Sequence, residues 1–178
     1  WHTPTQTTYY PLQNAANEIS KKINTSNPTI MLLHGFQDGP LRFTPLANLY
    51  LNMSDYNMLL LDCELVLRGN YFHSVAMLQP ISESISKFFA KLVQKNNLDP
   101  RTVHLIGMSL GAQLAGGIGG NIFKTSNKKI GRITGLDPAG PCFSGTNLDN
   151  VLDKKDAGFV DIIHVNKGIQ GMIETLGH

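Results

Sequence analysis

The sequence predicts a mostly parallel α/β sheet flanked by helices, and three observations support this fold class. Short apolar runs alternate with segments of helical periodicity along the chain. The first two runs are apolar on both faces, which is typical of strands buried between two layers of helices. A Gly-x-Ser-x-Gly pattern follows a third run and indicates a sharp strand-to-helix turn. Since 178 residues, 42% of them hydrophobic, suffice for one packed core, we expect a single domain or part of one.

Each of the first three predicted strands is an apolar run followed by a residue that stops it. The first run stops at His34-Gly35, the second at Asp62 and the third at Gly107. In chain order, the predicted strands are residues 29–33, 57–61, 102–106, 130–136 and 159–164.

Three segments between the strands have helical character. Apolar residues recur at helical spacing in the second of them, and the third is rich in Ala and Gly. The predicted helices are residues 43–52, 75–92 and 110–123, with Pro80 near the first turns of the second helix. Because no repeat, low-complexity tract or linker interrupts this order, we expect no domain boundary within residues 1–178.

The distribution of charge and hydropathy argues against two classes of partner. The formal charge of +2 comes from 15 basic and 13 acidic residues that are scattered along the chain. No basic run could follow a phosphate backbone, so a nucleic acid partner is not expected. Every apolar run is far shorter than the roughly 20 residues that a transmembrane helix needs, so no transmembrane segment is expected either.

The sequence leaves the cellular compartment open. Cys63 and Cys142 are compatible with one disulfide, with two buried thiols, or with neither. Glycosylation acceptor motifs begin at Asn24 and Asn52, which is compatible with secretion but also expected by chance. The chain opens with Trp1 and has no secretory signal pattern, so we expect a start that has been processed or cut.

The candidate nucleophile is Ser109, because Gly107-Met108-Ser109-Leu110-Gly111 has the spacing of a nucleophile elbow. Such a turn needs its glycines, since a Cβ two residues on either side of the serine would clash with neighbouring backbone. The turn would expose the hydroxyl and place the amino end of the next helix beneath it, where free N–H groups favour negative charge. A chance match is the alternative, and the flanking strand and small-residue helix argue against it.

Asp137 is the candidate acid of a catalytic triad. It ends a predicted strand and follows Ser109 in the chain, which is the order found in α/β hydrolases. A role limited to the turn with Pro138 is the alternative. Asp62 also ends a strand, but it precedes Ser109 and would reverse the expected order.

The candidate base is harder to assign, because only His164 and His178 follow Asp137. His104 lies on the strand before Ser109, roughly 16 Å from it at about 3.3 Å per residue. From its position at the end of the last strand, His164 is the provisional base. A packed histidine bonded to backbone is the alternative reading.

Several ordered motifs resemble the pancreatic lipase family, and its neutral lipases and phospholipases A1 fit best. These motifs are His34-Gly35-Phe36, Gly107 to Ala112, Thr134 to Pro141 and Phe159 to His164, and the resemblance extends over nearly the whole chain. It implies an α/β-hydrolase fold and a secreted, extracellular enzyme that attacks lipid esters at a lipid–water interface. It also implies Ser109 as nucleophile and Asp137 as acid, with the backbone N–H groups of Phe36 and Leu110 forming the oxyanion hole.

The same resemblance changes the assignment of the base. In the family, the histidines that correspond to His164 and His178 are not catalytic, and the catalytic histidine lies beyond a lid. The resemblance therefore implies a chain truncated before the lid, the last strands and the catalytic histidine. We expect purified residues 1–178 to be nearly inactive, because Ser109 would lack its base.

The resemblance also bears on substrate and metal. The segment 165–177 is shorter than in pancreatic triglyceride lipases and resembles that of phospholipase A1 members. Asp153 and Asp156 match the family's calcium region, but Leu148 and Val151 replace polar ligands, so no metal and no cofactor are expected. The alternative function is that of a non-catalytic binding or storage protein, since lipase-like yolk proteins have lost the nucleophile.

Overall fold

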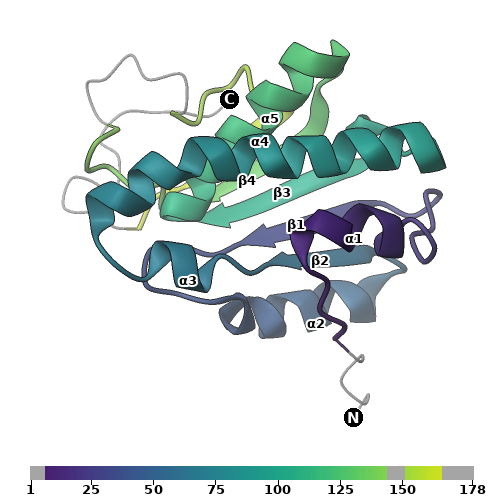
Figure 1. Cartoon of the computed structure of the whole chain (residues 1–178), viewed down its shortest axis with the longest axis horizontal. Helices are drawn as coiled ribbons and strands as arrows, with labels where there is room; N and C mark the ends of the chain where they lie inside the picture. Colours follow the sequence, from purple (N-terminus) through teal and green to yellow (C-terminus); the bar gives the residue numbers. More distant parts are fainter. Residues whose placement is uncertain (1–6, 144–150, 166–178) are drawn as a thin grey trace.

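Five parallel strands form one sheet in the computed structural model, which describes residues 7–143 and 151–165 (Figure 1). The strands are β1 (Thr29–Leu33), β2 (Asn57–Leu61), β3 (Val103–Met108), β4 (Ile130–Leu136) and β5 (Ala157–Ile163). Their order across the sheet is β2-β1-β3-β4-β5, and every neighbouring pair is parallel. The predicted parallel α/β architecture is therefore confirmed. The carboxyl ends of all five strands lie along the same side of the sheet.

Helices cover both faces of the sheet. They are α1 (Leu12–Ile19), α2 (Thr44–Met53), α3 (Glu64–Leu67), α4 (Tyr71–Asn96) and α5 (Leu110–Ser126), with 3-10 turns η1 (Pro40–Phe43) and η2 (Pro100–Thr102). The larger apolar core joins α1, α4 and α5 to one face, and a smaller one joins α2 to the other. None of the helices in the part of the chain described by the structure is long and apolar enough to cross a membrane.

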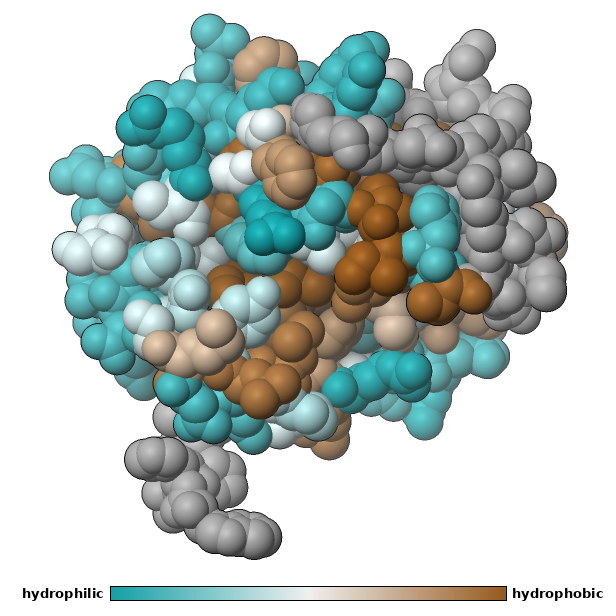
Figure 2. All heavy atoms as spheres, turned by 180° about the vertical axis from the view of Figure 1, so that it is seen from behind, coloured by the Kyte–Doolittle hydropathy of each residue, from teal (hydrophilic) through white to brown (hydrophobic). Residues whose placement is uncertain are grey.

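The second face is only partly covered by the described residues. Helix α2 and the preceding turn η1 pack over β1 and β3 through Ala47 and Phe43, respectively. Two apolar residues at the β4–β5 end, Phe159 and Ile163, remain about half exposed. Seen from behind, apolar side chains gather in the middle of the molecular surface (Figure 2).

Helix α4 begins earlier than predicted, and the reason is a side-chain cap. The Asn70 side chain accepts hydrogen bonds from the backbone N–H of Phe72 at 2.9 Å and of His73 at 3.3 Å. The helix therefore starts at Tyr71 rather than at residue 75. Pro80 was predicted near the first turns, but because the helix begins at Tyr71, Pro80 lies further inside it.

Strand β2 was predicted to be fully buried, but all five of its residues are only half-buried. It lies at the edge of the described sheet, whereas β1 has neighbours on both sides and is buried throughout. A groove of about 920 Å³ runs along β2 and is lined by residues such as Tyr10, Met58 and Leu65. Ser109 does not line this groove.

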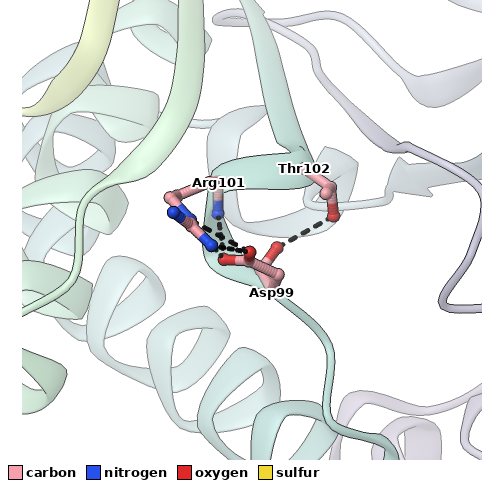
Figure 3. Close-up of polar contacts among 3 residues, drawn as sticks. All are labelled: Asp99, Arg101 and Thr102. Atoms are coloured by element: carbon pink, nitrogen blue, oxygen red, sulfur yellow. Dashed lines mark hydrogen bonds and ion pairs between the residues drawn. The ribbon is translucent and has the colours of Figure 1, made fainter.

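A polar turn fixes the start of β3, the strand that leads to Ser109 (Figure 3). The Asp99 carboxylate accepts hydrogen bonds from the backbone N–H of Arg101 at 3.0 Å and from its guanidinium at 2.7 Å. The Thr102 hydroxyl donates to the Asp99 carbonyl at 2.8 Å. The bonds from Arg101 lower the pKa of the Asp99 carboxyl below its ordinary value. This turn places Val103 directly beside Thr29, which sets the register of β3 against β1.

Candidate active site

Ser109 lies at the turn between β3 and α5 and has a strained backbone. Its φ of 54° and ψ of −117° fall outside the regions that L-residues ordinarily occupy. Three backbone hydrogen bonds hold this conformation. The Ser109 N–H donates to the Leu136 carbonyl at 3.0 Å, and the Ser109 carbonyl accepts from Ala112 at 3.1 Å and Ala139 at 3.2 Å. Strain of this kind is typical of functional sites, where the surrounding structure maintains it.

The two glycines that flank Ser109 are required by close backbone contacts. A Cβ at Gly107 would overlap the carbonyl oxygen of Gly111. A Cβ at Gly111 would overlap the carbonyl oxygen of Leu33 and would lie 2.6 Å from that of His34. The steric need for glycine, predicted from the Gly-x-Ser-x-Gly spacing, is confirmed.

Two backbone N–H groups are available beside Ser109. Leu110 is the first residue of α5, so its N–H has no partner within the helix. Phe36 lies in the loop after β1, and this loop passes close to the serine. A Cβ at the preceding Gly35 would lie only 3.0 Å from the Ser109 Cβ and 3.6 Å from its Oγ. Within residues 7–143 and 151–165, neither N–H donates a hydrogen bond.

The His34 side chain holds this loop in place, and both of its ring nitrogens form hydrogen bonds. Its side chain is 2% exposed, and Nε2 accepts a hydrogen bond from the backbone N–H of Cys63 at 2.9 Å. Because an amide N–H can only donate, this nitrogen carries no proton, and Nδ1 donates to the Gly35 carbonyl at 3.0 Å. His34 therefore joins the ends of β1 and β2 and is not free to act as a base.

Asp137 follows β4 as directly as Ser109 follows β3. Met108 and Leu136 are partners in the parallel register, so Ser109 and Asp137 are the next residues on adjacent strands. Asp137 has a φ of 47°. Its N–H donates to the Ile163 carbonyl at 2.7 Å, and its Oδ1 accepts from the Val165 N–H at 3.3 Å.

Asp62, the alternative candidate acid, lies at the carboxyl end of a different strand. It follows β2, and β1 separates β2 from β3. Its Oδ1 accepts a hydrogen bond from the Glu64 N–H at 3.1 Å at the start of α3. The strand order therefore favours Asp137 over Asp62 as the partner of Ser109.

The described histidines do not complete a triad with Ser109. His104 Nε2 lies 2.8 Å from the Thr134 Oγ1, and burial lowers the pKa of the ring to about 4. His73 lies in the first turn of α4. His164 follows β5 beside the Asp137 turn, but both of its ring nitrogens are buried without a hydrogen bond in the described part of the chain. His2 and His178 lie outside the described residues.

The carboxylates of Asp153 and Asp156 accept hydrogen bonds from backbone N–H groups of their own loop. Asp153 Oδ1 accepts from the Lys155 N–H, and Asp156 Oδ2 accepts from the Asp153 N–H, each at 2.8 Å. Burial raises the pKa of Asp156 to about 7. Within the described ranges, no group of three or more His, Cys, Asp or Glu side chains could hold a metal ion. Leu148, from the same predicted region, lies outside these ranges.

Both cysteines are free thiols, Cys63 buried and Cys142 half-buried. Of the alternatives that the sequence left open, this excludes the disulfide in the structure. Burial raises the pKa of Cys63 to about 12, so its thiol is not a competing nucleophile.

Gln113 is a functional candidate that the sequence reasoning missed. Its side chain is completely buried, and its amide bonds to Ala139 at 2.7 Å and to Leu152 at 2.8 Å. A signal was present, because Gln113 is the only polar side chain between Leu110 and Gly116. A lone polar residue on an otherwise apolar helix needs a buried hydrogen-bond partner.

Comparison with known proteins relates this chain to lipases and phospholipases. The family model described as Lipase matches residues 3–178. Pancreatic lipase-related protein 3 from Homo sapiens is 40% identical over 142 residues, which cover 75% of this chain and 28% of the relative. Phospholipase A1 member A from Rattus norvegicus is 34% identical over 162 residues, covering 89% of this chain and 34% of the relative. The chain spans about a third of the length of these curated relatives.

A solved structure is similar in fold. It is a protein of the alpha/beta superfamily from Xanthomonas campestris pv. campestris, with a TM-score of 0.52 and 20% sequence identity. The match covers 81% of this chain and 74% of that protein. At this level of identity the likeness shows the fold alone.

Proposed function

Because the chain belongs to the lipase family, whose model matches residues 3–178, we propose that the protein hydrolyses lipid esters through an acyl-enzyme on Ser109. The observation that carries this proposal is the strained turn at Ser109, beside which the N–H groups of Phe36 and Leu110 donate to no acceptor among the described residues. A turn that served packing alone would not need to maintain this conformation.

The geometry supports the following chemistry. The Ser109 Oγ attacks the carbonyl carbon of the ester and gives its proton to the base, and the carbonyl oxygen becomes an oxyanion. The N–H groups of Phe36 and Leu110 donate to this oxygen, and the amino end of α5 adds a favourable dipole. The oxyanion collapses, the ester C–O bond breaks, and the alcohol leaves with the proton that the base received from Ser109. The base then takes a proton from water, which attacks the acyl-enzyme, and returns that proton to Ser109 as the acid leaves.

In this proposal Asp137 orients the base, and the base is a histidine outside residues 1–178. The adjacent ends of β3 and β4 support the first assignment. The second is supported by the described histidines, none of which hydrogen-bonds to Ser109 within residues 7–143 and 151–165. We further propose that residues 1–178 form part of one α/β-hydrolase domain, without a metal or cofactor.

The proposed substrate is a lipid ester at a lipid–water interface, either a triacylglycerol or a phospholipid. The relatives named pancreatic lipase-related protein 3 and phospholipase A1 member A support this class. We propose an extracellular location, for which the acceptor asparagines Asn24 and Asn52 are both exposed. A mass decrease on enzymatic removal of N-glycans would support secretion.

A fluorophosphonate probe on the full-length protein tests this function. We expect labelling that disappears in Ser109→Ala and persists in Ser84→Ala, an exposed serine on α4. Turnover of a triacylglycerol and of a phospholipid by the wild type would then identify the substrate class. Absence of labelling in the wild type would favour a non-catalytic binding or storage protein.

A further inference from the structure

Gln113 connects three segments that are far apart in the sequence. Its Nε2 donates to the Ala139 carbonyl at 2.7 Å, and its Oε1 accepts from the Leu152 N–H at 2.8 Å. Since a carbonyl can only accept and an N–H can only donate, the orientation of the amide is fixed. The side chain is fully buried, so water cannot easily replace either partner.

These bonds reach the turn that carries Asp137. Ala139 lies two residues after Asp137, and its N–H donates to the Ser109 carbonyl at 3.2 Å. The peptide groups on both sides of Ala139 are thus bonded to the segment that begins at Ser109, one through Ser109 itself and one through Gln113. Together with the bond from the Ser109 N–H to the Leu136 carbonyl, these two bonds connect the Asp137 turn to the segment that begins at Ser109.

The small residues around Gln113 bring its partners within reach. A Cβ at Gly116 would lie 2.7 Å from the Leu152 Cα, so the chain at Leu152 packs directly against α5. A Cβ at Gly135 would lie 2.9 Å from the Leu152 Cδ2 and 3.2 Å from the Pro138 Cγ. Leu152 therefore also packs beneath the turn that contains Asp137.

We propose that Gln113 is a positioning residue, whose buried amide holds the Asp137 turn against the helix that starts at Ser109. This inference rests on the proposed function. Gln113 does not touch the reacting atoms, and it acts on hydrolysis through the placement of Asp137. Loss of its donor leaves the Ala139 carbonyl buried and unpaired, and the turn then moves to find another partner.

Two variants of the full-length protein test this role by kcat per fluorophosphonate-titrated site. Gln113→Met has a similar volume and no donor. We expect a fall in kcat of roughly 10- to 100-fold with little change in KM, because a small misplacement of a catalytic group has effects of this size. Gln113→Glu keeps the acceptor for Leu152, but only the protonated carboxyl can donate to Ala139. Its kcat should therefore be near wild type at low pH and fall as pH rises through the pKa of the introduced carboxyl.

Ile118→Ala is the matched control, because Ile118 is fully buried on the same helix. It should lower thermal stability and leave kcat per titrated site unchanged. If the Gln113 variants also lose only stability and keep the wild-type pH profile, the positioning role is wrong. If the wild type neither labels nor turns over, the proposed function fails instead.

Hydrogen exchange provides a readout that does not require activity. The Ala139 N–H, which bonds to the Ser109 carbonyl, should exchange faster in Gln113→Met than in Ile118→Ala. Equal exchange in the two variants would overturn the positioning role whether or not the protein is an enzyme.

Discussion

At the scale of single residues, the site depends on how closely backbone segments approach one another. Ser109 can hold its unusual φ and ψ because Gly107 and Gly111 leave space for neighbouring carbonyl groups. The contacts at both glycines are with backbone atoms, which cannot rotate away as a side chain would. Substitution at these positions should therefore affect the fold and the candidate site together.

Gly111→Ala should destabilise the full-length protein by about 1–3 kcal/mol or more, since the new methyl group would overlap the Leu33 carbonyl. Gly69→Ala is the control, because its Cβ would meet nothing within 4 Å. We expect the control to change stability by about 0.5 kcal/mol or less. Chemical unfolding measures both, and equal stability of the two variants would contradict the steric explanation.

Asp156 should make stability depend on pH. Burial is the main cause that raises its pKa from 3.8 to about 7. The hydrogen bond from the Asp153 N–H lowers this pKa, the charge of Asp153 raises it, and the charges of Lys129 and Lys124 lower it. Between pH 3.8 and about pH 7, the Asp156 carboxyl is ionised in the unfolded chain and protonated in the folded chain. The free energy of unfolding should therefore fall as pH rises from about 4 to 7, by a few kcal/mol at most, and then level off.

Asp156→Asn removes this titration and keeps an oxygen that can accept from Asp153. Chemical unfolding at pH 5 and pH 8 should show a smaller difference in this variant than in the wild type. Asp55→Asn, at an exposed aspartate, should retain the wild-type difference. If the free energy of unfolding differs between pH 5 and pH 8 as much in Asp156→Asn as in the wild type, Asp156 is not the cause of the pH dependence.

Single residues were predictable where the signal is local. The sharp turn at Ser109 was predicted from five positions of sequence, and the place of Asp137 from the strand that it follows, while their catalytic roles stay predictions. The role of Gln113 was not predictable, because Ala139 and Leu152 are 26 and 39 residues away in the chain. Whether a glutamine is buried and bonded depends on packing that the sequence of one helix does not specify.

At the scale of elements, α5 is adapted to close packing along one side. Its glycines allow the segment around Leu152 and Asp156 to approach the helix backbone. Neighbouring glycines on the same helix differ sharply in this respect. A Cβ at Gly119 would overlap the carbonyl oxygen of Asp156, whereas a Cβ at Gly120 would meet only the Asp156 Oδ1 at 3.4 Å.

These two glycines provide a matched pair. Gly120→Ala should stabilise the protein by about 0.5–1 kcal/mol, because alanine has the higher helix propensity and an ordinary contact results. Gly119→Ala should be destabilising, because the methyl group meets backbone. Thermal unfolding of the two variants should show shifts of opposite sign, and two shifts of the same sign would contradict this account.

The strands were better predicted than the helices. The predicted bounds of β1, β2 and β4 agree with the structure, because apolar runs flanked by polar or glycine residues mark both ends. Helices α1 and α3 were missed, since they span only 8 and 4 residues; α1 is amphipathic, but two turns of helix are a short segment to recognise from spacing. The start of α4 could have been found from Asn70, a residue type that favours helix N-caps.

At the scale of the whole molecule, the strand order creates the candidate site. Because β3 and β4 are adjacent, residues 109 and 137 meet at one edge of the sheet. Sequence predicted a parallel sheet but not this order, which depends on long-range pairing. The family resemblance predicted from the motifs agrees with the match of the Lipase model to residues 3–178.

Purified residues 1–178 should hydrolyse a short-chain p-nitrophenyl ester at a small fraction of the rate of the full-length protein. The reason is that the proposed base lies outside these residues, and an oxyanion hole alone gives only a small part of normal turnover. Ser109→Ala in the same chain is the control for background hydrolysis. Rates comparable to those of the full-length protein would make His164 the base after all.

The half-buried edge strand β2 has a practical consequence for the purification of residues 1–178. Its outer edge pairs with no strand of the described residues, and four of its five residues are Met or Leu. Unprotected edges of this composition recruit other chains into intermolecular β-structure. We therefore expect residues 1–178 to associate through this edge at high concentration, where Met58 and Leu60 also pack against the smaller core and leave no position for a charged side chain without a loss of packing.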